Sequence, residues 1–216
     1  MKIATWNIER LKAIKQKETI ESILSSVNAD ILVLTEADTR ITLTNYTYKV
    51  FSEELNPAQY NPTERRVAIY SKYEIIRQLK TFDAKTSLCV ELKTNMGNLI
   101  VYGTIIGVYG NRNADFNKDL SKQLEDFKAL FGKNHCIIGD YNISFGDNYY
   151  YTKTGRDLLN ELFKMNDLKL VTNNLPEAID HIAISSALIQ NHKIETEEWN
   201  FDKSLSDHKG VSMKFL

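Results

Sequence analysis

Apolar runs and helical patterns alternate in the first part of the chain. Lys2 to Trp6 and Ile31 to Leu34 are apolar runs typical of buried strands, and residues 16–27 between them place apolar side chains at helical spacing. A strand, a helix and a strand in succession predict a right-handed βαβ unit with parallel strands. Glu9 and Glu36, which follow the two strands, should therefore be neighbours at one edge of a sheet.

Five short β-like runs follow, separated by turn residues, and they predict an antiparallel meander. They cover Tyr48–Phe51, Val67–Tyr70, Ile75–Leu79, Leu88–Leu92 and Leu99–Ile106. A loop from Asn56 to Arg66 precedes the second of these runs and ends in Arg65 and Arg66. Adjacent arginines are usual on a solvated edge, but one of them could instead hold a substrate phosphate.

The second half repeats the alternation of helices and strands. Residues 115–131 form one apolar helical stripe that ends at Phe131, and a strand from Cys136 to Ile138 follows. A further amphipathic helix contains Leu158, Leu159, Leu162 and Phe163, and short strands are expected at 182–184 and 211–215. Because a helix and sheet pattern occurs in each half, we expect two sheets face to face with helices outside.

Composition limits the class of protein. With 216 residues, 43% hydrophobic and 25% charged, the chain should form one globular domain over residues 1–216. The net charge of −1 and the pI near 6.4 argue against a broad basic face that coats nucleic acid, but not against a local phosphate site. We find no leader or membrane-spanning pattern, and Cys89 and Cys136 lie in apolar runs, which predicts a cytoplasmic protein with no membrane attachment.

Acidic and amide side chains gather where the predicted strands end. Five carboxylates at one rim would repel one another unless a cation lay among them, and oxygen ligands with amide support are what Mg²⁺ or Mn²⁺ prefers. No cluster of Cys and His residues suggests zinc. The candidates are Asn7, Glu9, Glu36, Asp140, Asn142, Asp180, Asp207 and His208.

His208 has a possible role of its own in this set. A carboxylate beside a histidine fixes the imidazole tautomer and leaves the other ring nitrogen free to exchange a proton. Either Asp180 or Asp207 could orient His208. A lone histidine is more often structural, and we assign that role to the remaining ones, His135, His181 and His192.

The segment from Asp147 to Arg156 is expected to be a loop. It contains three consecutive tyrosines, Tyr149 to Tyr151, and a strand would point alternate side chains outward. At least one tyrosine should therefore be exposed near Asp140, where it could stack on a ligand. Tyr150 and Arg156 are the residues of this loop that we predict to contact substrate.

Several short motifs resemble those of the endonuclease/exonuclease/phosphatase superfamily, which has the DNase I-like fold. They match in order and spacing over Met1 to Leu216. The resemblance implies a four-layer α/β sandwich of two mixed sheets and hydrolysis of a phosphoester by water with Mg²⁺ or Mn²⁺. The motifs are Trp6-Asn7-Ile8-Glu9, Leu34-Thr35-Glu36, Gly139-Asp140-Tyr141-Asn142, Ile179-Asp180-His181 and Ser206-Asp207-His208.

The resemblance also implies roles for these residues. Glu36 looks like the main metal ligand, with Asn7, Glu9 and Asp207 beside it. Asp140 and Asn142 resemble the pair that positions or deprotonates the attacking water and holds the phosphoryl group. His208 with Asp180 resembles the dyad that contacts the scissile phosphate or acts as the base, so the proton acceptor is either Asp140 or His208.

One position departs from the pattern. Many members of the superfamily have a histidine after the strand that ends here at Gly103 and Thr104, where this chain has Ile105 and Ile106. The acid that protonates the leaving group is therefore not the usual one. A metal-bound water, Tyr102 or Tyr141 could replace it, and a leaving group that needs little protonation would not require it.

Three functions are compatible with these residues. The first is a phosphodiesterase or nuclease that acts on DNA, RNA or a nucleotide, with Arg65, Arg66, Tyr150 and Arg156 as substrate contacts. The second is a phosphatase of a small phosphorylated metabolite or lipid headgroup, which the near-neutral charge favours. The third is a binding module that has lost catalysis, which retention of every acid and of His208 disfavours. No protein partner is indicated.

Overall fold

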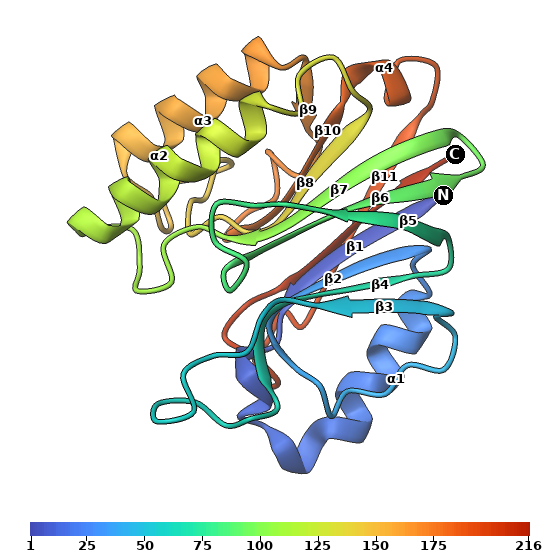
Figure 1. Cartoon of the computed structure of the whole chain (residues 1–216), viewed down its shortest axis with the longest axis vertical. Coiled ribbons are helices and arrows are strands. Elements are labelled where there is room, and N and C mark those ends of the chain that lie inside the picture. Colours follow the sequence, from blue (N-terminus) through green and yellow to red (C-terminus); the bar gives the residue numbers. More distant parts are fainter.

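Two six-stranded β-sheets pack face to face, with helices on their outer sides (Figure 1). The computed structural model describes residues 1–216. Sheet A contains, in spatial order, β11 (Ile194–Trp199), β12 (Gly210–Phe215), β1 (Lys2–Asn7), β2 (Ile31–Asp38), β4 (Glu64–Ser71) and β3 (Tyr48–Phe51). Sheet B contains β5 (Glu74–Leu79), β6 (Ser87–Thr94), β7 (Gly97–Ile105), β8 (His135–Asp140), β10 (Asp180–Ser185) and β9 (Leu168–Leu170). The helices are α1 (Lys17–Val27), α2 (Ala114–Lys128), α3 (Lys153–Met165) and α4 (Ser186–Ile189), with 3₁₀ turns η1 (Glu9–Leu11) and η2 (Ile14–Gln16).

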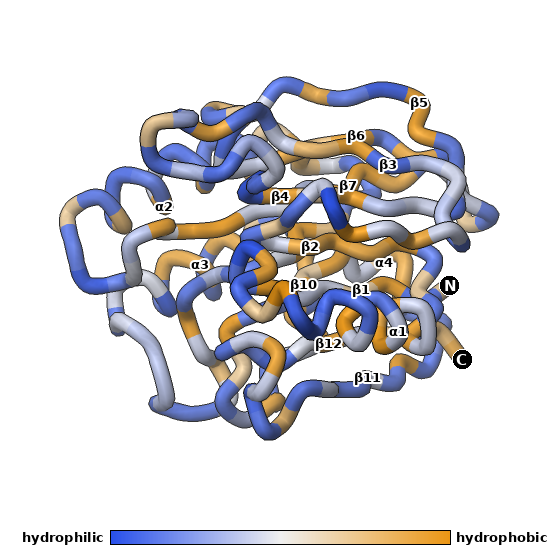
Figure 2. The backbone as a smooth tube through the Cα atoms, turned by 90° about the horizontal axis from the view of Figure 1, so that it is seen from below, coloured by the Kyte–Doolittle hydropathy of each residue, from blue (hydrophilic) through white to orange (hydrophobic).

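Three apolar layers hold the sandwich together. Val33 of sheet A and Val101 of sheet B belong to the layer between the two sheets. Ile20 of α1 packs against the outer face of sheet A, and Phe116 of α2 packs with α3 against sheet B. Figure 2 shows the central strands largely in orange and the connecting loops largely in blue. This arrangement confirms the predicted four-layer α/β sandwich.

The direction of the strands determines where the polar ends meet. β1 and β2 are parallel, as are β7 and β8, and α1 and α2 form the respective crossovers. The carboxyl ends of all four strands therefore lie at one end of the sandwich, on the left in Figure 1. Because β10 pairs antiparallel with β8 and β12 pairs antiparallel with β1, β10 and β12 begin at the same end. We call this end of the molecule the rim.

Two strands of the structure, β9 and β11, fall outside the predicted runs. β9 has three residues, which is too short for a pattern to be recognised. β11 is an edge strand with the sequence IETEEW, and Figure 2 shows it as largely hydrophilic. Acidic residues on an exposed edge discourage pairing with other chains, but they also hide the strand from a search for apolar runs.

Three predicted boundaries are wrong. Arg65 and Arg66 lie within β4 and not in a loop, because β2 continues to Asp38 and pairs with this part of β4. Arg156 lies in α3, which begins after the N-cap residue Thr152. Phe131 lies beyond the end of α2 and is 66% exposed, so it is not part of the buried stripe.

Both cysteines are buried within sheet B, as predicted, and neither forms a disulfide. No helix of the chain combines the length and apolar character that crossing a membrane requires.

Gly139 allows β7 and β8 to approach closely beside the rim. Its φ is +137°, which L residues with a side chain rarely adopt, and a Cβ atom there would lie 2.1 Å from the carbonyl oxygen of Thr104. A shift of either strand would move the neighbouring Asp140. The glycine at this position therefore helps to fix the position of the Asp140 carboxylate.

We predict that Gly139→Ala lowers the free energy of unfolding by about 3 kcal/mol, because it adds a clash with backbone to an unfavourable φ. Urea unfolding measures the change. The matched control is Gly132→Ala, where φ is +76° but nothing lies within 4 Å, so about 1 kcal/mol is expected. Equal losses in the two variants would show that the close approach contributes nothing.

Candidate active site

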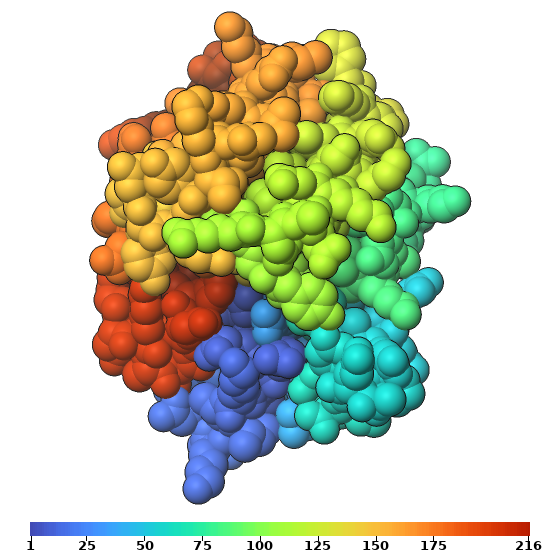
Figure 3. Space-filling view, turned by 90° about the vertical axis from the view of Figure 1, so that its left-hand side faces the viewer, coloured from blue at the N-terminus to red at the C-terminus, as the bar shows by residue number.

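Loops from distant parts of the chain meet at the rim, which faces the viewer in Figure 3. The dark blue N-terminal segment, the cyan segment before β4, the lime segment after β7 and the red segment before β12 surround one area of this face. Three of the predicted site residues adopt the left-handed backbone conformation that favours glycine, namely Glu9, Glu36 and Asn142. Strained backbone of this kind is concentrated at functional sites.

Asn7, at the end of β1, reaches across to the other sheet. Its Nδ2 donates a hydrogen bond to Oδ2 of Asp140 at 3.1 Å, and both residues are at least 97% buried. The backbone N–H of Asn142 donates to Oδ1 of Asp140 at 2.8 Å. Asp140 is therefore fixed by one donor from each sheet.

Asn142 is held by the loop that follows β7. Its Nδ2 donates to the carbonyl oxygens of Ile106 at 3.0 Å and Gly107 at 3.2 Å. Because these bonds occupy the amide donors, Oδ1 is the atom of Asn142 that remains for a water or a substrate hydrogen.

Helix α2 supports this loop in turn. Asp119 Oδ2 accepts a hydrogen bond from the N–H of Gly107 at 2.6 Å, and Gln123 Nε2 donates to the carbonyl of Ile105 at 2.9 Å. Ile105 and Ile106 themselves are buried, so the strand end where the resemblance led us to look for a histidine presents no polar side chain.

His208 and Asp180 form a close pair. His208 Nδ1 lies 2.6 Å from Asp180 Oδ2, whereas His208 Nε2 lies 3.5 Å from Asp207 Oδ1. The side chain of Asp180 is 1% exposed and that of Asp207 is 68% exposed. Of the two carboxylates that could orient His208, Asp180 makes the shorter and better shielded contact.

The backbone around His208 is tied to the N-terminal strand. Trp6 Nε1 donates to the carbonyl of His208 at 3.0 Å, and Ser206 Oγ donates to the carbonyl of Asn7 at 2.6 Å. The dyad is thus held against the end of β1 by bonds that its own side chains do not supply.

Burial and mutual charge shift the acids and bases of this cluster. Burial raises the pKa of Asp140 to about 7, although the charge of His208 acts in the opposite direction. Burial disfavours the charged form of His208, but the charges of Asp180 and Asp140 outweigh it and raise its pKa to about 10. His208 is therefore a cation at neutral pH in this arrangement.

Asp140, Asp180 and His208 are also close enough to share an ion. One ligand atom from each lies within 4.8 Å of the others. Asp180 Oδ1 is buried and has no hydrogen-bond partner, so it is an acceptor that nothing in the chain satisfies. This trio offers a possible acidic and imidazole site for a metal ion or a polar ligand.

The four residues that the resemblance assigns to the metal lie around the ends of β1 and β2. The N–H of Glu9 donates to Asn7 Oδ1 at 2.9 Å, and the N–H of Asp207 lies 3.4 Å from Glu9 Oε2. Glu36 belongs to β2, whose Thr35 is the parallel partner of Asn7. Their donors are carboxylate and amide oxygens, which fit a hard divalent cation.

Two basic residues pair with these carboxylates. Arg10 Nε lies 3.0 Å from Glu36 Oε2, and Lys12 Nζ lies 2.5 Å from Glu9 Oε1. Both side chains are partly exposed and can move aside at small cost. A cation that binds Glu36 must therefore compete with Arg10 for its carboxylate.

The structure does not bring Tyr102 to the rim. β7 alternates its side chains, and Tyr102 lies on the face covered by α2, where its hydroxyl donates to Asp126 Oδ2 at 2.7 Å. Tyr141 is likewise fully buried, and its hydroxyl donates to the carbonyl of Ile137 at 2.8 Å. Neither tyrosine faces a position where a leaving group could lie.

Two of the predicted substrate contacts support loops instead. Arg156 stacks on Tyr151 at 3.7 Å and donates to the carbonyl oxygens of Ser144 and Asp147. Arg65 donates to the carbonyl of Pro62 at 2.7 Å and pairs with an exposed glutamate at 3.0 Å. Their guanidinium groups are engaged within the chain, which leaves little for a substrate phosphate.

The remaining two predicted contacts, Tyr150 and Arg66, lie beside the loop after β7 and the loop before β4. The hydroxyl of Tyr150 accepts a bond from the N–H of Asn111 at 3.4 Å. Arg66 Nη2 donates to the hydroxyl of Tyr60 at 2.7 Å. Tyr149 is the half-exposed tyrosine of the three, although these residues form no strand, and its hydroxyl accepts from Lys203 at 3.0 Å.

Sequence reasoning missed Tyr60, Tyr109 and Asp119. Tyr60 and Tyr109 are isolated aromatic residues in loops. Asp119 lies in α2 between the apolar positions, where a charged residue is expected to face solvent. The one available signal was the density of Gly, Asn and Tyr between residues 107 and 113, which is typical of a functional loop.

A model of the endonuclease/exonuclease/phosphatase family matches residues 4–208, which include every motif described above. The chain belongs to this family. No curated protein matches the sequence. Membership agrees with the resemblance seen in the five short motifs and with the two mixed sheets.

Solved structures of family proteins have the same fold at low sequence identity. A variant of the 3′ phosphatase NExo from Neisseria, bound to a product DNA hairpin, has a TM-score of 0.75 and 17% identity, and the match covers 100% of this chain and 99% of that one. An endonuclease/exonuclease/phosphatase from Beutenbergia cavernae gives 0.74 and 15%, with 100% and 71% covered. An AP endonuclease from Archaeoglobus fulgidus gives 0.69 and 15%, with 100% and 99% covered.

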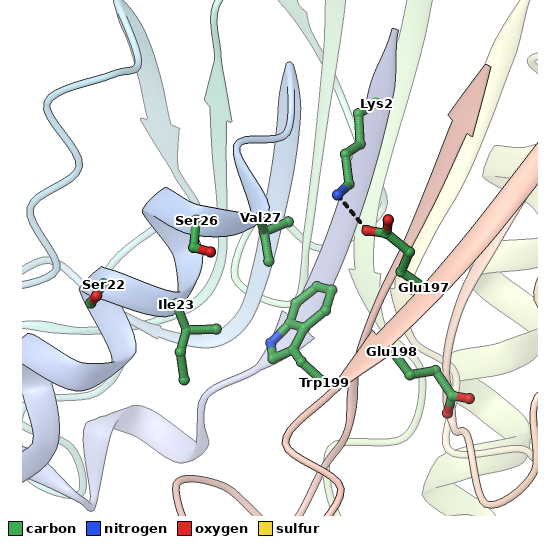
Figure 4. Close-up of a pocket in the computed structure, with 8 residues that line it drawn as sticks. All are labelled: Lys2, Ser22, Ile23, Ser26, Val27, Glu197, Glu198 and Trp199. Carbon is green, nitrogen blue, oxygen red and sulfur yellow. Dashed lines mark hydrogen bonds and ion pairs between the residues drawn. The ribbon is translucent and has the colours of Figure 1, made fainter. Parts of the chain in front are cut away.

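A cavity of about 580 Å³ lies apart from the candidate active site at the rim, between α1 and β11 (Figure 4). Ile23 and Val27 of the helix face Trp199 across it, and Lys2 pairs with Glu197 at 2.5 Å along one side. None of the predicted site residues lines this cavity.

His181, next to Asp180, has the structural role that we predicted for it. It is fully buried, its Nδ1 lies 2.8 Å from Thr172 Oγ1, and its Nε2 lies 2.9 Å from the carbonyl of Ile143. A carbonyl can only accept, so Nε2 bears the hydrogen and Nδ1 accepts from the threonine.

We predict that this histidine makes the fold sensitive to acid. Burial lowers the pKa of His181 to about 4, so the unfolded chain takes up the proton first, and stability falls as the pH decreases from about 6.5 to about 4. The loss approaches about 3 kcal/mol. Urea unfolding at several pH values should show a shallower decline for His181→Gln, whatever its stability at neutral pH. Parallel declines would contradict this assignment.

Proposed function

We propose that the protein is a divalent-metal-dependent phosphoester hydrolase, and that it acts as a phosphodiesterase or nuclease on nucleic acid or a nucleotide. The observation that supports this best is the buried contact of Asn7 with Asp140 beside the dyad of Asp180 and His208. It joins a fixed carboxylate, a fixed amide and an oriented imidazole at one rim. Membership of a family of phosphoester hydrolases supports the reaction class.

In this proposal, Mg²⁺ or Mn²⁺ is held by Glu36 with Asn7, Glu9 and Asp207. Their oxygen donors fit such an ion, and when bound it supplies positive charge that stabilises the phosphoryl oxygens. Arg10 pairs with Glu36 at 3.0 Å, so it would have to release this carboxylate for Glu36 to hold an ion.

The protein groups then orient water and phosphate. Asp140 can only accept in its charged form, and Asn7 and the Asn142 N–H fix it, so we assign it the role of accepting the proton of the attacking water. Asn142 Oδ1 orients that water. His208, with Nδ1 bonded to Asp180, donates from Nε2 to a phosphoryl oxygen.

No side chain is assigned to protonate the leaving group. Ile105 and Ile106 occupy the strand end concerned, and the hydroxyl groups of Tyr102 and Tyr141 are buried in other bonds. We infer that solvent water supplies this proton.

A phosphatase of a small phosphorylated metabolite or lipid headgroup is the second candidate. It is favoured by the net charge of −1 and by the engagement of Arg65 and Arg156 in bonds within the chain. Few free cations then remain along the rim to follow a long phosphate backbone.

We predict metal-dependent hydrolysis that requires the dyad. The substrates are single-stranded DNA, duplex DNA, RNA and p-nitrophenyl phosphate, each with Mg²⁺, with Mn²⁺ and with EDTA. His208→Ala and Asp140→Asn should each lower the rate by about a hundredfold or more. His192→Ala, an exposed histidine beside α4, is the control and should retain the parent rate.

The substrates also separate the candidate functions. Cleavage of polynucleotides supports a nuclease, whereas activity on the monoester alone supports a phosphatase. Hydrolysis that survives EDTA or His208→Ala would contradict the mechanism, and a lack of any hydrolysis would favour a binding module.

We further predict that Glu36→Gln weakens Mn²⁺ binding by about tenfold or more, because it removes the charge of the assigned main ligand. Calorimetric titration measures this without any substrate. Glu195→Gln, on the exposed edge strand β11, is the control and should bind as the parent does. Identical titrations for the parent and Glu36→Gln would remove Glu36 from the metal site.

A further inference from the structure

An exposed tyrosine stands at the tip of the loop after β7. Tyr109 is 72% exposed, although tyrosine is a large and partly apolar side chain. It lies in a tight turn, in which the N–H of Gly110 donates to the carbonyl of Gly107 at 2.9 Å. Gly107 has a φ of +73°, and a Cβ there would lie 2.3 Å from Phe116, so the turn needs glycine.

Both sides of this turn are bonded to Asn142. Before the tip, the carbonyl of Gly107 accepts from Asn142 Nδ2 at 3.2 Å. After the tip, Asn111 Nδ2 donates to the carbonyl of Asn142 at 2.6 Å. The turn that carries Tyr109 is therefore anchored directly beside a residue of the candidate active site.

A second tyrosine meets Tyr109 from the other sheet. Tyr60 lies in the loop before β4, and hydrogen bonding between the two hydroxyl groups raises the pKa of Tyr109. Arg66 donates to the Tyr60 hydroxyl at 2.7 Å, and its guanidinium lies 4.8 Å from the centre of the Tyr60 ring.

Arg66, which supports Tyr60, is adjacent to Glu36. Thr35 pairs with Val67 and Ala37 pairs with Arg65, so Glu36 and Arg66 are opposite each other between β2 and β4. Tyr60, which bonds to Arg66, therefore lies on the Glu36 side of the rim, and Tyr109 lies on the Asn142 side.

We propose that Tyr109, supported by Tyr60 and Arg66, is a stacking platform for the nucleobase next to the scissile phosphate. The inference rests on the proposed hydrolase function and specifies its substrate as a nucleic acid with an unpaired base. An exposed aromatic ring on a turn that is bonded to Asn142 offers a flat face beside the candidate site, and base stacking contributes about 1–3 kcal/mol for each base.

The chemistry of the platform disfavours the other substrates. A sugar phosphate or a lipid headgroup has no flat aromatic group to place on an exposed ring. An acyl chain requires an apolar groove, whereas this ring lies exposed on a polar turn, in which the amides of Asn111 and Asn113 bond to the carbonyl oxygens of Asn142 and Tyr109. A nucleobase has a flat face that can stack on an exposed aromatic ring.

Two single strands of equal length test the proposal. One is oligothymidylate, and the other has tetrahydrofuran units in place of its nucleosides, so that it keeps the phosphodiester chain but lacks bases. Phosphorothioate versions resist hydrolysis and allow binding to be measured by fluorescence anisotropy with Mg²⁺. Hydrolysis of the ordinary phosphodiester versions is followed separately.

Tyr109→Ala should weaken binding of oligothymidylate by about tenfold and leave binding of the abasic strand unchanged. Tyr109→Phe keeps the ring and should remain within about twofold of the parent. Phe131→Ala, which removes an aromatic side chain that is 66% exposed just beyond the far end of α2, is the matched control and should change neither.

Equal binding of the two strands by the parent, or an equal loss on both strands in Tyr109→Ala, would overturn the platform. If the parent hydrolyses neither strand but still binds bases through Tyr109, the platform is supported and the hydrolase function fails. If the parent hydrolyses the strands but binds both equally well, the platform fails and the hydrolase function is supported.

Discussion

The candidate site depends on one buried hydrogen bond between the two sheets, from Asn7 Nδ2 to Asp140 Oδ2. Asn7 ends β1 in sheet A, and Asp140 ends β8 in sheet B, so the bond can form only if both strands end at the same height. The apolar layer between the sheets sets that height, because any slip would unpack side chains such as Val33 and Val101. Packing in the core thereby determines the geometry at the rim.

Charge is the second constraint. Asp140 and Asp180 are cross-strand partners in β8 and β10, and both are almost completely buried. Two carboxylates so placed are unfavourable unless a positive group lies between or beside them, and His208 is that group in this structure. The same logic extends to Glu36 and Glu9, which pair with Arg10 and Lys12. Each of these four acids therefore has a basic neighbour.

Much of this could be predicted from the sequence, because strand ends are local features. The apolar runs before Asn7, Glu36 and Asp140 indicated which residues reach the rim, and the βαβ pattern predicted that the ends of β1 and β2 are adjacent, as their parallel pairing confirms. The residues alone left Asp180 and Asp207 open as partners of His208, and the family resemblance pointed to Asp180. The structure has the shorter contact with Asp180, which the antiparallel pairing of β10 with β8 places beside Asp140.

The side chains for which sequence reasoning failed have a common cause. Tyr102 points to the outer face of sheet B, whereas its neighbours in β7 point to the inner face. Arg156 lies a few residues inside α3, whose start the sequence does not mark strongly. A residue type suited to chemistry indicates a role only if its direction is known. The direction in which a side chain points depends on how the whole chain packs.

The bonds that close the rim join residues at opposite ends of the chain. Ser206 to Asn7 spans 199 positions, and Trp6 to His208 spans 202. Contacts of such sequence separation form late in folding, because the loop that they close is longest. A partly folded chain in which β12 is not yet paired with β1 lacks these two bonds, so the candidate site is complete only in the native state.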